Sequence, residues 1–249
     1  MPLYGLIGYP LAHSFSQKYF TQKFANGNLH DCSYLNFEME NIAEIKNILS
    51  SRPSLEGLNV TIPHKTSVIP FLDEIDKTAA EINAVNTISI KNGKLKGYNT
   101  DIIGFVKSLQ NFIGNKKVSA LILGTGGSAK AVEYVLKKLG IDYLFVSRNA
   151  SGPKAITYSA LTEQIISQRT LLINCTPFGK FPHVNTFPPI DYNFITNRHF
   201  LFDLNYNPAQ TEFLKHGMQK SAQVKNGYEM LTLQAEAAWE IWRIEGASE

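Results

Sequence analysis

The chain has 249 residues, of which 44% are hydrophobic and 18% are charged, and its formal net charge is +3. This is the composition of a folded globular protein, and it excludes long disordered segments. The charge is too small and too evenly spread for a nucleic-acid-binding protein, and the length favours two compact domains over one.

Strand and helix patterns alternate over the first hundred residues. Strand patterns are at 3–8, 32–39 and 58–62, and helical patterns are at 16–25, 41–50, 64–72 and 73–82. A hairpin is predicted where 85–90 and 94–98 flank Asn92 and Gly93, because both residues tolerate positive φ. These patterns predict an α/β domain with a mixed sheet.

The alternation continues after a helical pattern at 101–112. Strand patterns are at 118–124, 143–147, 170–174 and 200–204, helical patterns are at 128–139, 159–167 and 209–217, and a long amphipathic helix is expected at 228–245. Repeated βα units predict a Rossmann-like, doubly wound parallel sheet. No segment is apolar over a membrane-spanning length, and the N-terminus lacks the features of a signal peptide, so we expect a cytoplasmic protein without a membrane partner.

A glycine-rich turn joins the strand at 118–124 to the next helix. It consists of Gly124, Thr125, Gly126, Gly127, Ser128 and Ala129. In a dinucleotide-binding turn the first glycine permits the tight bend, the second lets the backbone approach the diphosphate, and a third small residue lets the helix pack closely on the strand. A purely structural turn is the alternative.

The next strand ends in Ser147 and Arg148. An NAD site places Asp or Glu there to bind the ribose 2′-hydroxyl, whereas a guanidinium suits a 2′-phosphate. The pattern therefore predicts NADP as the cofactor, with an ordinary exposed arginine as the alternative interpretation.

Seven short motifs, in matching order and spacing, resemble those of the shikimate dehydrogenase family. They lie at 8–16, 59–65, 84–87, 97–101, 174–179, 203–208 and 226–231, followed by Gln234. The resemblance spans nearly the whole chain. It implies a substrate-binding and catalytic domain at 1–100 and 229–249 and an NADP-binding Rossmann-like domain at 101–228. It also implies reversible NADPH-dependent reduction of 3-dehydroshikimate to shikimate, in the biosynthesis of chorismate and the aromatic amino acids.

The resemblance also implies which residues form the site. Lys65 and Asp101 are the expected catalytic pair. The expected substrate-binding residues are Ser14, Ser16, Thr61, Asn86, Asn99, Tyr206 and Gln234, and Thr176 and Gly227 are expected beside the cofactor. Physical chemistry supports this choice, because a substrate with a carboxylate and hydroxyls needs hydroxyl and amide partners, and hydride transfer to a ketone needs a proton donor. We expect Asp101 to orient Lys65, which donates the proton in reduction and accepts it in oxidation.

Structural interpretations remain open for single residues. Asp101 alone would be a helix N-cap, Lys65 a solvated helix lysine, and Ser14 and Ser16 turn or cap residues. The family usually has Pro where this chain has Gln17, and His-Asn where it has Tyr19 and Phe20, which leaves the start of the first helix open.

Two other functions are alternatives. One is a quinate/shikimate dehydrogenase with broader substrate and cofactor use, and the other is a non-catalytic NADP-binding regulator. The spacing of the six histidines predicts no metal site, and no phosphate-binding Walker loop or nucleophile elbow is found. The partners expected are small molecules and not nucleic acids, and both a monomer and a homodimer stay possible.

Overall fold

The computed structural model describes residues 1–12 and 14–246, and the chain forms two compact units. Unit 1 comprises Met1–Thr100 and Gln234–Glu249, and unit 2 comprises Asp101–Leu233. In this division residues 229–233 fall in unit 2. His13 of the first motif and residues 247–249 of the predicted substrate domain lie outside the described residues.

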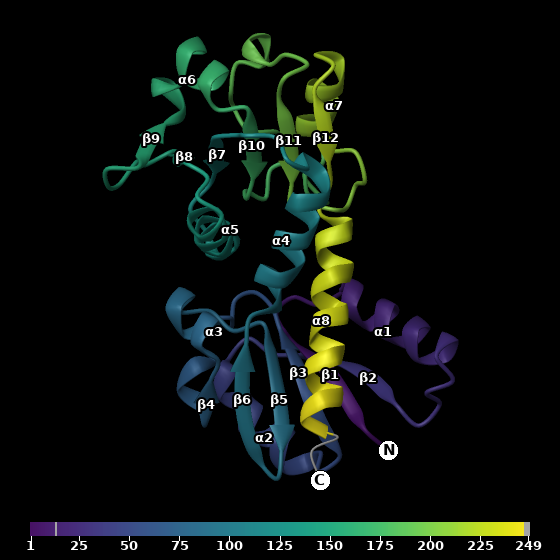
Figure 1. Ribbon diagram of the computed structural model, residues 1–249. Helices are drawn as coiled ribbons and strands as arrows, with labels where there is room; N and C mark the ends of the chain where they lie inside the picture. Colours follow the sequence, from purple (N-terminus) through teal and green to yellow (C-terminus); the bar gives the residue numbers. More distant parts are fainter. Residues whose placement is uncertain (13, 247–249) are drawn as a thin grey trace. The chain divides into compact units, whose positions relative to one another are not determined.

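Unit 1 is built on a six-stranded mixed sheet (Figure 1) with the order β2-β1-β3-β5-β6-β4. Its strands are β1 (Leu3–Gly8), β2 (Ser33–Glu38), β3 (Leu55–Val60), β4 (Glu74–Ile75), β5 (Thr87–Lys91) and β6 (Lys94–Tyr98). Strand β5 runs antiparallel to β3 and β6, and the other neighbours are parallel. Asn92 and Gly93 have φ of 50° and 75°, as the predicted hairpin requires. The predicted mixed sheet is confirmed.

Helices cover both faces of this sheet. They are α1 (Phe15–Asn26), α2 (Ile45–Ser51), α3 (Lys77–Ile82) and the unit 1 part of α8 (Tyr228–Gly246), with short 3-10 helices η1 (Ile42–Glu44) and η2 (Ile69–Phe71). On one face α1 and α8 pack on the sheet through Phe20, Tyr34, Trp239 and Trp242. On the other, residues from η1 to α3 enclose Ile7, Leu58 and Ile88. Because strand side chains alternate between faces, one strand serves both cores.

Two predicted helices of unit 1 are wrong in extent. The segment 64–72 forms turns and the short helix η2, because Pro70 lacks the N–H that a longer helix needs. The helix expected at 73–82 begins only at Lys77. Asp76 is its N-cap and accepts the N–H groups of Thr78 and Ala79, while residues 74–75 pair with β6 instead.

Unit 2 contains a parallel six-stranded sheet with the order β12-β11-β10-β7-β8-β9. Its strands are β7 (Ala120–Leu123), β8 (Tyr143–Ser147), β9 (Ala155–Thr157), β10 (Leu171–Asn174), β11 (Phe200–Asp203) and β12 (Gln223–Lys225). The order reverses between β7 and β10, as in a Rossmann sheet, so the predicted doubly wound sheet is confirmed. Strands β9 and β12 were not predicted, because three residues are too few for a periodic pattern.

The helices of unit 2 are α4 (Thr100–Ile113, from its second residue), α5 (Gly127–Lys138), α6 (Glu163–Gln168), α7 (Glu212–Gln219) and the first six residues of α8, with η3 (Tyr158–Ala160) and η4 (Tyr192–Phe194). Leu121, Leu172 and Leu201, from three neighbouring strands, pack with Phe213 of α7 on one face. Phe105 of α4 packs against Phe202 of β11. Strands buried on both faces explain the nearly continuous apolar runs in the sequence.

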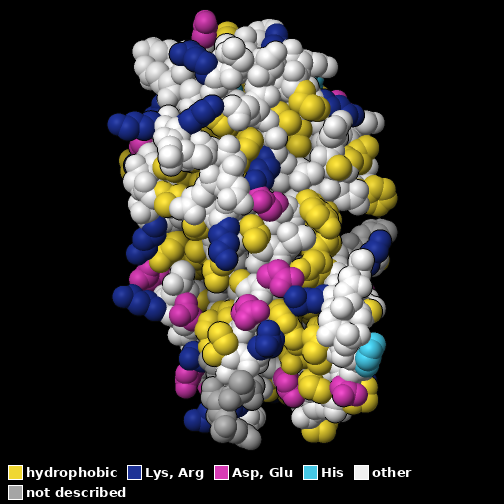
Figure 2. Space-filling model, turned by 45° about the vertical axis from the view of Figure 1, so that its right-hand side comes forward, with side chains coloured by type: hydrophobic (Ala, Val, Ile, Leu, Met, Phe, Trp, Pro, Cys, Tyr) yellow, Lys and Arg dark blue, Asp and Glu magenta, His cyan; other side chains and the backbone are white. Residues whose placement is uncertain are grey.

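The chain passes between the units twice, and both passages lie inside helices. The first is in α4, between Thr100 and Asp101, and the second is in α8, between Leu233 and Gln234. Within the described residues, no helix is both long and apolar enough to span a membrane. On the face drawn in Figure 2, positive and negative side chains are interspersed, in keeping with the small net charge.

Candidate active site

Most of the predicted substrate-binding residues of unit 1 lie at one edge of its sheet. Ser14 and Ser16 follow β1, Thr61 follows β3, Asn86 precedes β5, and Asn99 follows β6. Because β5 is antiparallel to β3 and β6, its first residue lies at the same edge as their last residues. The topology therefore gathers four segments that are far apart in the sequence.

Backbone hydrogen bonds join three of these segments. The N–H of Thr61 donates to the carbonyl oxygen of Ile7 at 2.9 Å, and the N–H of Val60 donates to that of Asn86 at 2.8 Å. The N–H of Asn86 donates to the carbonyl oxygen of Tyr98 at 3.0 Å. The position of Asn86 is thus set from both neighbouring strands.

The side-chain amide of Asn86 has a defined orientation. Its Oδ1 accepts the backbone N–H of Thr100 at 2.7 Å, and a backbone N–H can only donate, so the oxygen and nitrogen cannot be exchanged. Its Nδ2 donates to Oε1 of Gln234 at 3.4 Å, and that oxygen also accepts the Thr100 hydroxyl at 3.3 Å. Because Oε1 of Gln234 accepts from these two donors, its Nε2 group is directed away from Asn86 and Thr100.

Two buried polar atoms at this edge lack a hydrogen-bond partner. They are Oγ of Ser14 and Oδ1 of Asn99. Ser14 is at the N-cap position of α1, but its side chain makes no capping hydrogen bond, so the hydroxyl is not used to cap the helix. Nδ2 of Asn99 is satisfied, because it donates to the carbonyl oxygen of Ala84 at 2.9 Å. Leaving a buried polar atom unpaired costs roughly 1–3 kcal/mol. Buried atoms without a partner in the protein are therefore candidates for binding a ligand.

The remaining three predicted residues are placed as follows. Lys65 lies in the turn after β3 and not in a helix, and its carbonyl oxygen accepts the N–H of Val85 at 2.8 Å. Asp101 is in the first turn of α4, directly after Thr100. Tyr206 follows β11 in unit 2, where burial raises its pKa. Since Lys65 belongs to unit 1 and Asp101 and Tyr206 to unit 2, their joint action stays a prediction.

In unit 2 the glycine-rich turn has the geometry of a diphosphate site. Gly124 has φ of 100°, and a Cβ on it would lie 2.9 Å from the side chain of Thr176. A Cβ on Gly126 or Gly127 would meet no atom within 4 Å. Gly126 is the N-cap of α5, no side chain caps this end, and the first turn holds no acidic residue. The positive helix end is therefore open to an anionic group, and the residues fit an NADP diphosphate.

The other predicted cofactor residues lie at the same edge of this sheet. Ser147 ends β8, Arg148 follows it and is exposed, and Thr176 follows β10. Ala129 is fully buried under the turn. Gly227 lies after β12, and a Cβ on it would be 2.2 Å from the carbonyl oxygen of Leu204, so this position needs glycine.

Lys154, six residues after Arg148, adds no charge beside it. Lys154 pairs with Asp142 at 3.5 Å and lies over the ring of Tyr143, at the start of β8. Arg148 follows the other end of that strand.

A buried carboxylate behind the predicted cofactor loops was missed. Asp203, at the end of β11, is fully buried and accepts hydrogen bonds from Asn174, Asn205 and Thr211. Burial raises its pKa to about 6, against the opposing effect of these hydrogen bonds. Asn174 in turn holds Thr176, whose hydroxyl donates to its Oδ1 at 2.6 Å. The signal in the sequence is an acidic residue that ends the otherwise apolar run 200–203.

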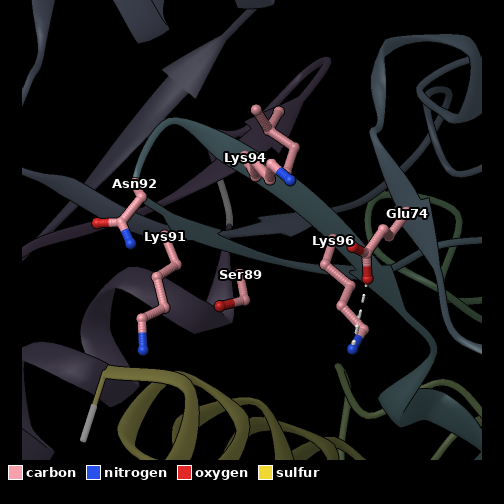
Figure 3. Close-up of a pocket in the computed structure, with 7 residues that line it drawn as sticks. Glu74, Ser89, Lys91, Asn92, Lys94 and Lys96 are labelled. Carbon is pink, nitrogen blue, oxygen red and sulfur yellow. Dashed lines mark ion pairs between the residues drawn. The ribbon is translucent and has the colours of Figure 1, made fainter. Parts of the chain in front are cut away.

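The clearest cavity of unit 1 lies elsewhere. It has a volume of about 290 Å³ and is lined by Glu74, Ser89, Lys91, Asn92, Lys94, Leu95 and Lys96, on the β5–β6 hairpin (Figure 3). None of the predicted site residues lines it. Lys96 pairs there with Glu74 at 3.7 Å. Within the described residues, no group of three or more His, Cys, Asp or Glu side chains could hold a metal ion.

The chain is similar to known proteins in sequence and in fold. The family model described as the shikimate dehydrogenase substrate binding domain matches residues 6–88. A shikimate dehydrogenase (NADP(+)) of Methanosphaera stadtmanae is 36% identical, over 96% of this chain and 90% of that protein. A crystal structure of a shikimate dehydrogenase in complex with NADP+ has a TM-score of 0.86 and 32% identity, covering 97% of this chain and 90% of that one.

A quinate dehydrogenase from Corynebacterium glutamicum, in complex with NAD, is similar as well. It has a TM-score of 0.84 and 27% identity, covering 97% of this chain and 93% of that one. The relative from Methanosphaera stadtmanae and the two solved structures each match at least 96% of this chain. The chain belongs to the shikimate dehydrogenase family of oxidoreductases.

Proposed function

We propose that this protein is an NADP-dependent shikimate dehydrogenase that reversibly reduces 3-dehydroshikimate to shikimate. The observation that carries the proposal is the edge of the unit 1 sheet, where buried hydroxyl and amide groups converge and two of their oxygens have no partner. A small polyhydroxylated acid offers both the donors and the acceptors that such an edge needs. The relatives that carry this activity in their names agree with it.

The unit 1 residues bind and orient the substrate in this proposal. Ser14 donates its hydroxyl hydrogen to the substrate carboxylate, and Ser16 and Thr61 add hydroxyl contacts. Asn86 and Gln234 offer N–H donors to substrate hydroxyls, because the oxygen of Asn86 accepts from Thr100 and the oxygen of Gln234 accepts from Asn86 and Thr100. Oδ1 of Asn99 accepts a substrate hydroxyl, and we assign a contact to Tyr206 as well.

Proton transfer is assigned to Lys65. NADPH, when bound, provides the hydride, and negative charge then develops on the ketone oxygen. The Lys65 ammonium donates a proton to that oxygen in the reduction, and the neutral amine accepts it in the oxidation. Asp101 orients the ammonium by hydrogen bonding. Without this donor the alkoxide would form unprotonated, at a much higher barrier.

Cofactor binding is assigned to the carboxyl edge of the unit 2 sheet. The backbone of Gly124, Thr125, Gly126, Gly127 and Ser128 surrounds the diphosphate, with Ala129 packing beneath it. Ser147 and Arg148 bind the adenosine 2′-phosphate. Thr176 and Gly227 lie beside the nicotinamide. The exposed guanidinium, at a strand end where NAD-specific sites hold an acid, is the feature that supports NADP.

We further propose a cytoplasmic enzyme without a nucleic-acid or membrane partner, acting as a monomer or a homodimer. Light scattering of the purified protein separates the two oligomeric states, since the chain mass is 27.8 kDa.

A quinate/shikimate dehydrogenase with broader cofactor use is the second candidate, supported by the similarity to an NAD-bound quinate dehydrogenase. The deciding experiment follows cofactor reduction with shikimate and with quinate, each with NADP and with NAD. We expect efficient turnover only with shikimate and NADP. Equal kcat/KM with quinate or NAD would favour the second candidate, and cofactor binding without any turnover would favour a non-catalytic regulator.

A further inference from the structure

A buried hydrogen-bonded chain crosses the unit 1 sheet from β2 to β5. The Tyr34 hydroxyl donates to Oδ1 of Asn59 at 2.8 Å, and each residue is only 4% exposed. Nδ2 of Asn59 lies 3.3 Å from Oγ1 of Thr87 and 3.4 Å from the carbonyl oxygen of Asn86. The Thr87 hydroxyl lies 3.2 Å from Oδ1 of Asn86. One phenol on β2 is thus connected to a predicted substrate-binding amide on β5.

The direction of these hydrogen bonds is fixed. The carbonyl oxygen of Asn86 can only accept, so the Asn59 amide turns its NH2 group toward β5 and its Oδ1 toward Tyr34, whose hydroxyl donates to it. In the absence of the phenol hydrogen, Oδ1 of Asn59 would be buried without a donor. The hydroxyl of Tyr34 therefore holds the Asn59 side chain in the place where its NH2 group meets Thr87 and Asn86.

The ring of Tyr34 packs against α1. The Phe20 ring stacks on it with centroids 4.6 Å apart and planes at 11°. Phe20, one of the two departures from the usual His-Asn pair, thus helps to hold the ring whose hydroxyl donates to Asn59.

We propose that Tyr34 is a positioning residue for substrate binding, whose hydroxyl sets Asn86 through Asn59 and Thr87. The inference rests on the proposed function, because Asn86 is a substrate-binding residue only within it. Tyr34 acts through these side chains, so its loss affects substrate affinity more than the chemical step.

Tyr4 provides a matched control. It is the cross-strand partner of Tyr34 on β1, it is also 4% exposed, and its hydroxyl donates to Oε2 of Glu56 at 3.1 Å. Its ring stacks on Trp242 with centroids 4.9 Å apart. Replacing Tyr4 by Phe removes a comparable hydroxyl on the same sheet face without interrupting the chain to Asn86.

The experiment compares the wild type with Tyr34→Phe and Tyr4→Phe in three measurements: steady-state kinetics, calorimetric titration of the cofactor-free protein with shikimate, and thermal unfolding. We expect Tyr34→Phe to raise both the KM and the Kd for shikimate about fivefold to tenfold, the effect of one misplaced hydrogen bond. The KM for NADP and kcat should change less than about twofold. Tyr4→Phe should leave shikimate binding unchanged.

A Tyr34→Phe protein that binds shikimate like Tyr4→Phe would overturn the inference. If the wild type itself neither binds nor oxidises shikimate, the proposed function fails instead, so the two failures are distinguishable. Should Tyr34→Phe not fold, Thr87→Val interrupts the chain between Asn59 and Asn86 with a side chain of the same shape. Thr87→Val must then raise the Kd for shikimate, and an unchanged Kd would refute the role of the chain.

Discussion

The side-chain oxygen of Asn86 accepts the backbone N–H of Thr100 at 2.7 Å, and Asp101 is the next residue along the chain. One hydrogen bond therefore ties a predicted substrate-binding amide to the start of the helix that carries a predicted catalytic carboxylate. Its loss would release the amide orientation and the first turn of α4 together.

Replacing Lys65 by Ala is expected to lower kcat by about 10²–10⁴-fold, the usual contribution of a positioned acid or base, while the KM for shikimate rises much less. Asp101→Asn should lower kcat in the same direction. Lys94→Ala is the matched control, because Lys94 is an exposed lysine of the same unit, on the hairpin of Figure 3. An unchanged kcat in Lys65→Ala would remove this lysine from the mechanism.

Arg148→Ala should raise the KM for NADP by roughly 10- to 100-fold, the loss of one charge-assisted contact, and leave the KM for NAD unchanged. Arg198→Ala changes another exposed arginine of unit 2 and should have no effect on either cofactor. Steady-state kinetics with both cofactors provide the measurement. A parallel loss with NAD and NADP would mean that Arg148 does not contact the 2′-phosphate.

The glycines of the α5 turn should separate binding from stability. Gly126→Val is expected to weaken NADP binding at least tenfold with an unchanged Tm, because its side chain points into open space in the protein alone. Gly124→Val should lower the Tm instead, since φ of 100° and the contact with Thr176 both oppose a side chain. Fluorescence titration with NADPH and thermal unfolding test both statements; a lowered Tm in Gly126→Val would contradict them.

Ser14→Ala should weaken shikimate binding while leaving the protein as stable or more stable. The hydroxyl is buried without a partner, so its removal relieves a desolvation penalty of roughly 1–3 kcal/mol. Calorimetric titration and urea unfolding test the two effects. Ser50→Ala, which loses an exposed hydroxyl bonded to the carbonyl oxygen of Asn47, should leave substrate binding unchanged. A destabilised Ser14→Ala protein would show that this hydroxyl is structural.

The raised pKa of Asp203 predicts a pH effect on stability. The folded protein holds this proton up to about pH 6, whereas an ordinary Asp releases it near 3.8, so ionisation opposes folding as the pH rises between these values. The full shift corresponds to roughly 3 kcal/mol. Relative to Asp203→Asn, the wild type should gain free energy of unfolding on going from pH 7 to pH 4.5, as measured by urea unfolding. A pH-independent difference would contradict the raised pKa.

Much of the fold was predictable because its strands are long or fully buried. The short apolar runs of unit 2, such as 200–203, and their alternation with helical patterns predict its parallel sheet. The pair Asn92-Gly93 predicts the β5–β6 hairpin from two residues alone. The errors fall where tertiary contacts decide the local structure. Residues 74–75 pair with β6 rather than extend α3, and no periodic pattern in two residues can indicate this.

The residue types of the candidate site were predictable from the sequence, but the hydrogen bonds that connect them were not. Ser14 was recognised, yet its lack of any capping bond emerges only from the three-dimensional arrangement. The roles of Asp203 and Tyr34 could not be predicted, because Asp203 ends an apolar run and Tyr34 lies within a mixed strand pattern, and neither pattern indicates a hydrogen-bond partner. Their partners Thr211 and Asn59 are 8 and 25 residues away in the sequence, so only the folded topology joins them.

Helix α8 begins in unit 2 and ends in unit 1. Unit 1 therefore cannot finish folding until the last residues of α8 have been synthesised. Gly57 of β3 leaves room for the Trp242 indole, which donates its N–H to the carbonyl oxygen of Ile88 at 2.9 Å. During synthesis the part of this sheet face that Trp239 and Trp242 cover stays exposed until the 133-residue insertion has been translated. During that interval chaperones can bind the exposed apolar side chains of unit 1. A chain truncated before α8 would expose these side chains permanently.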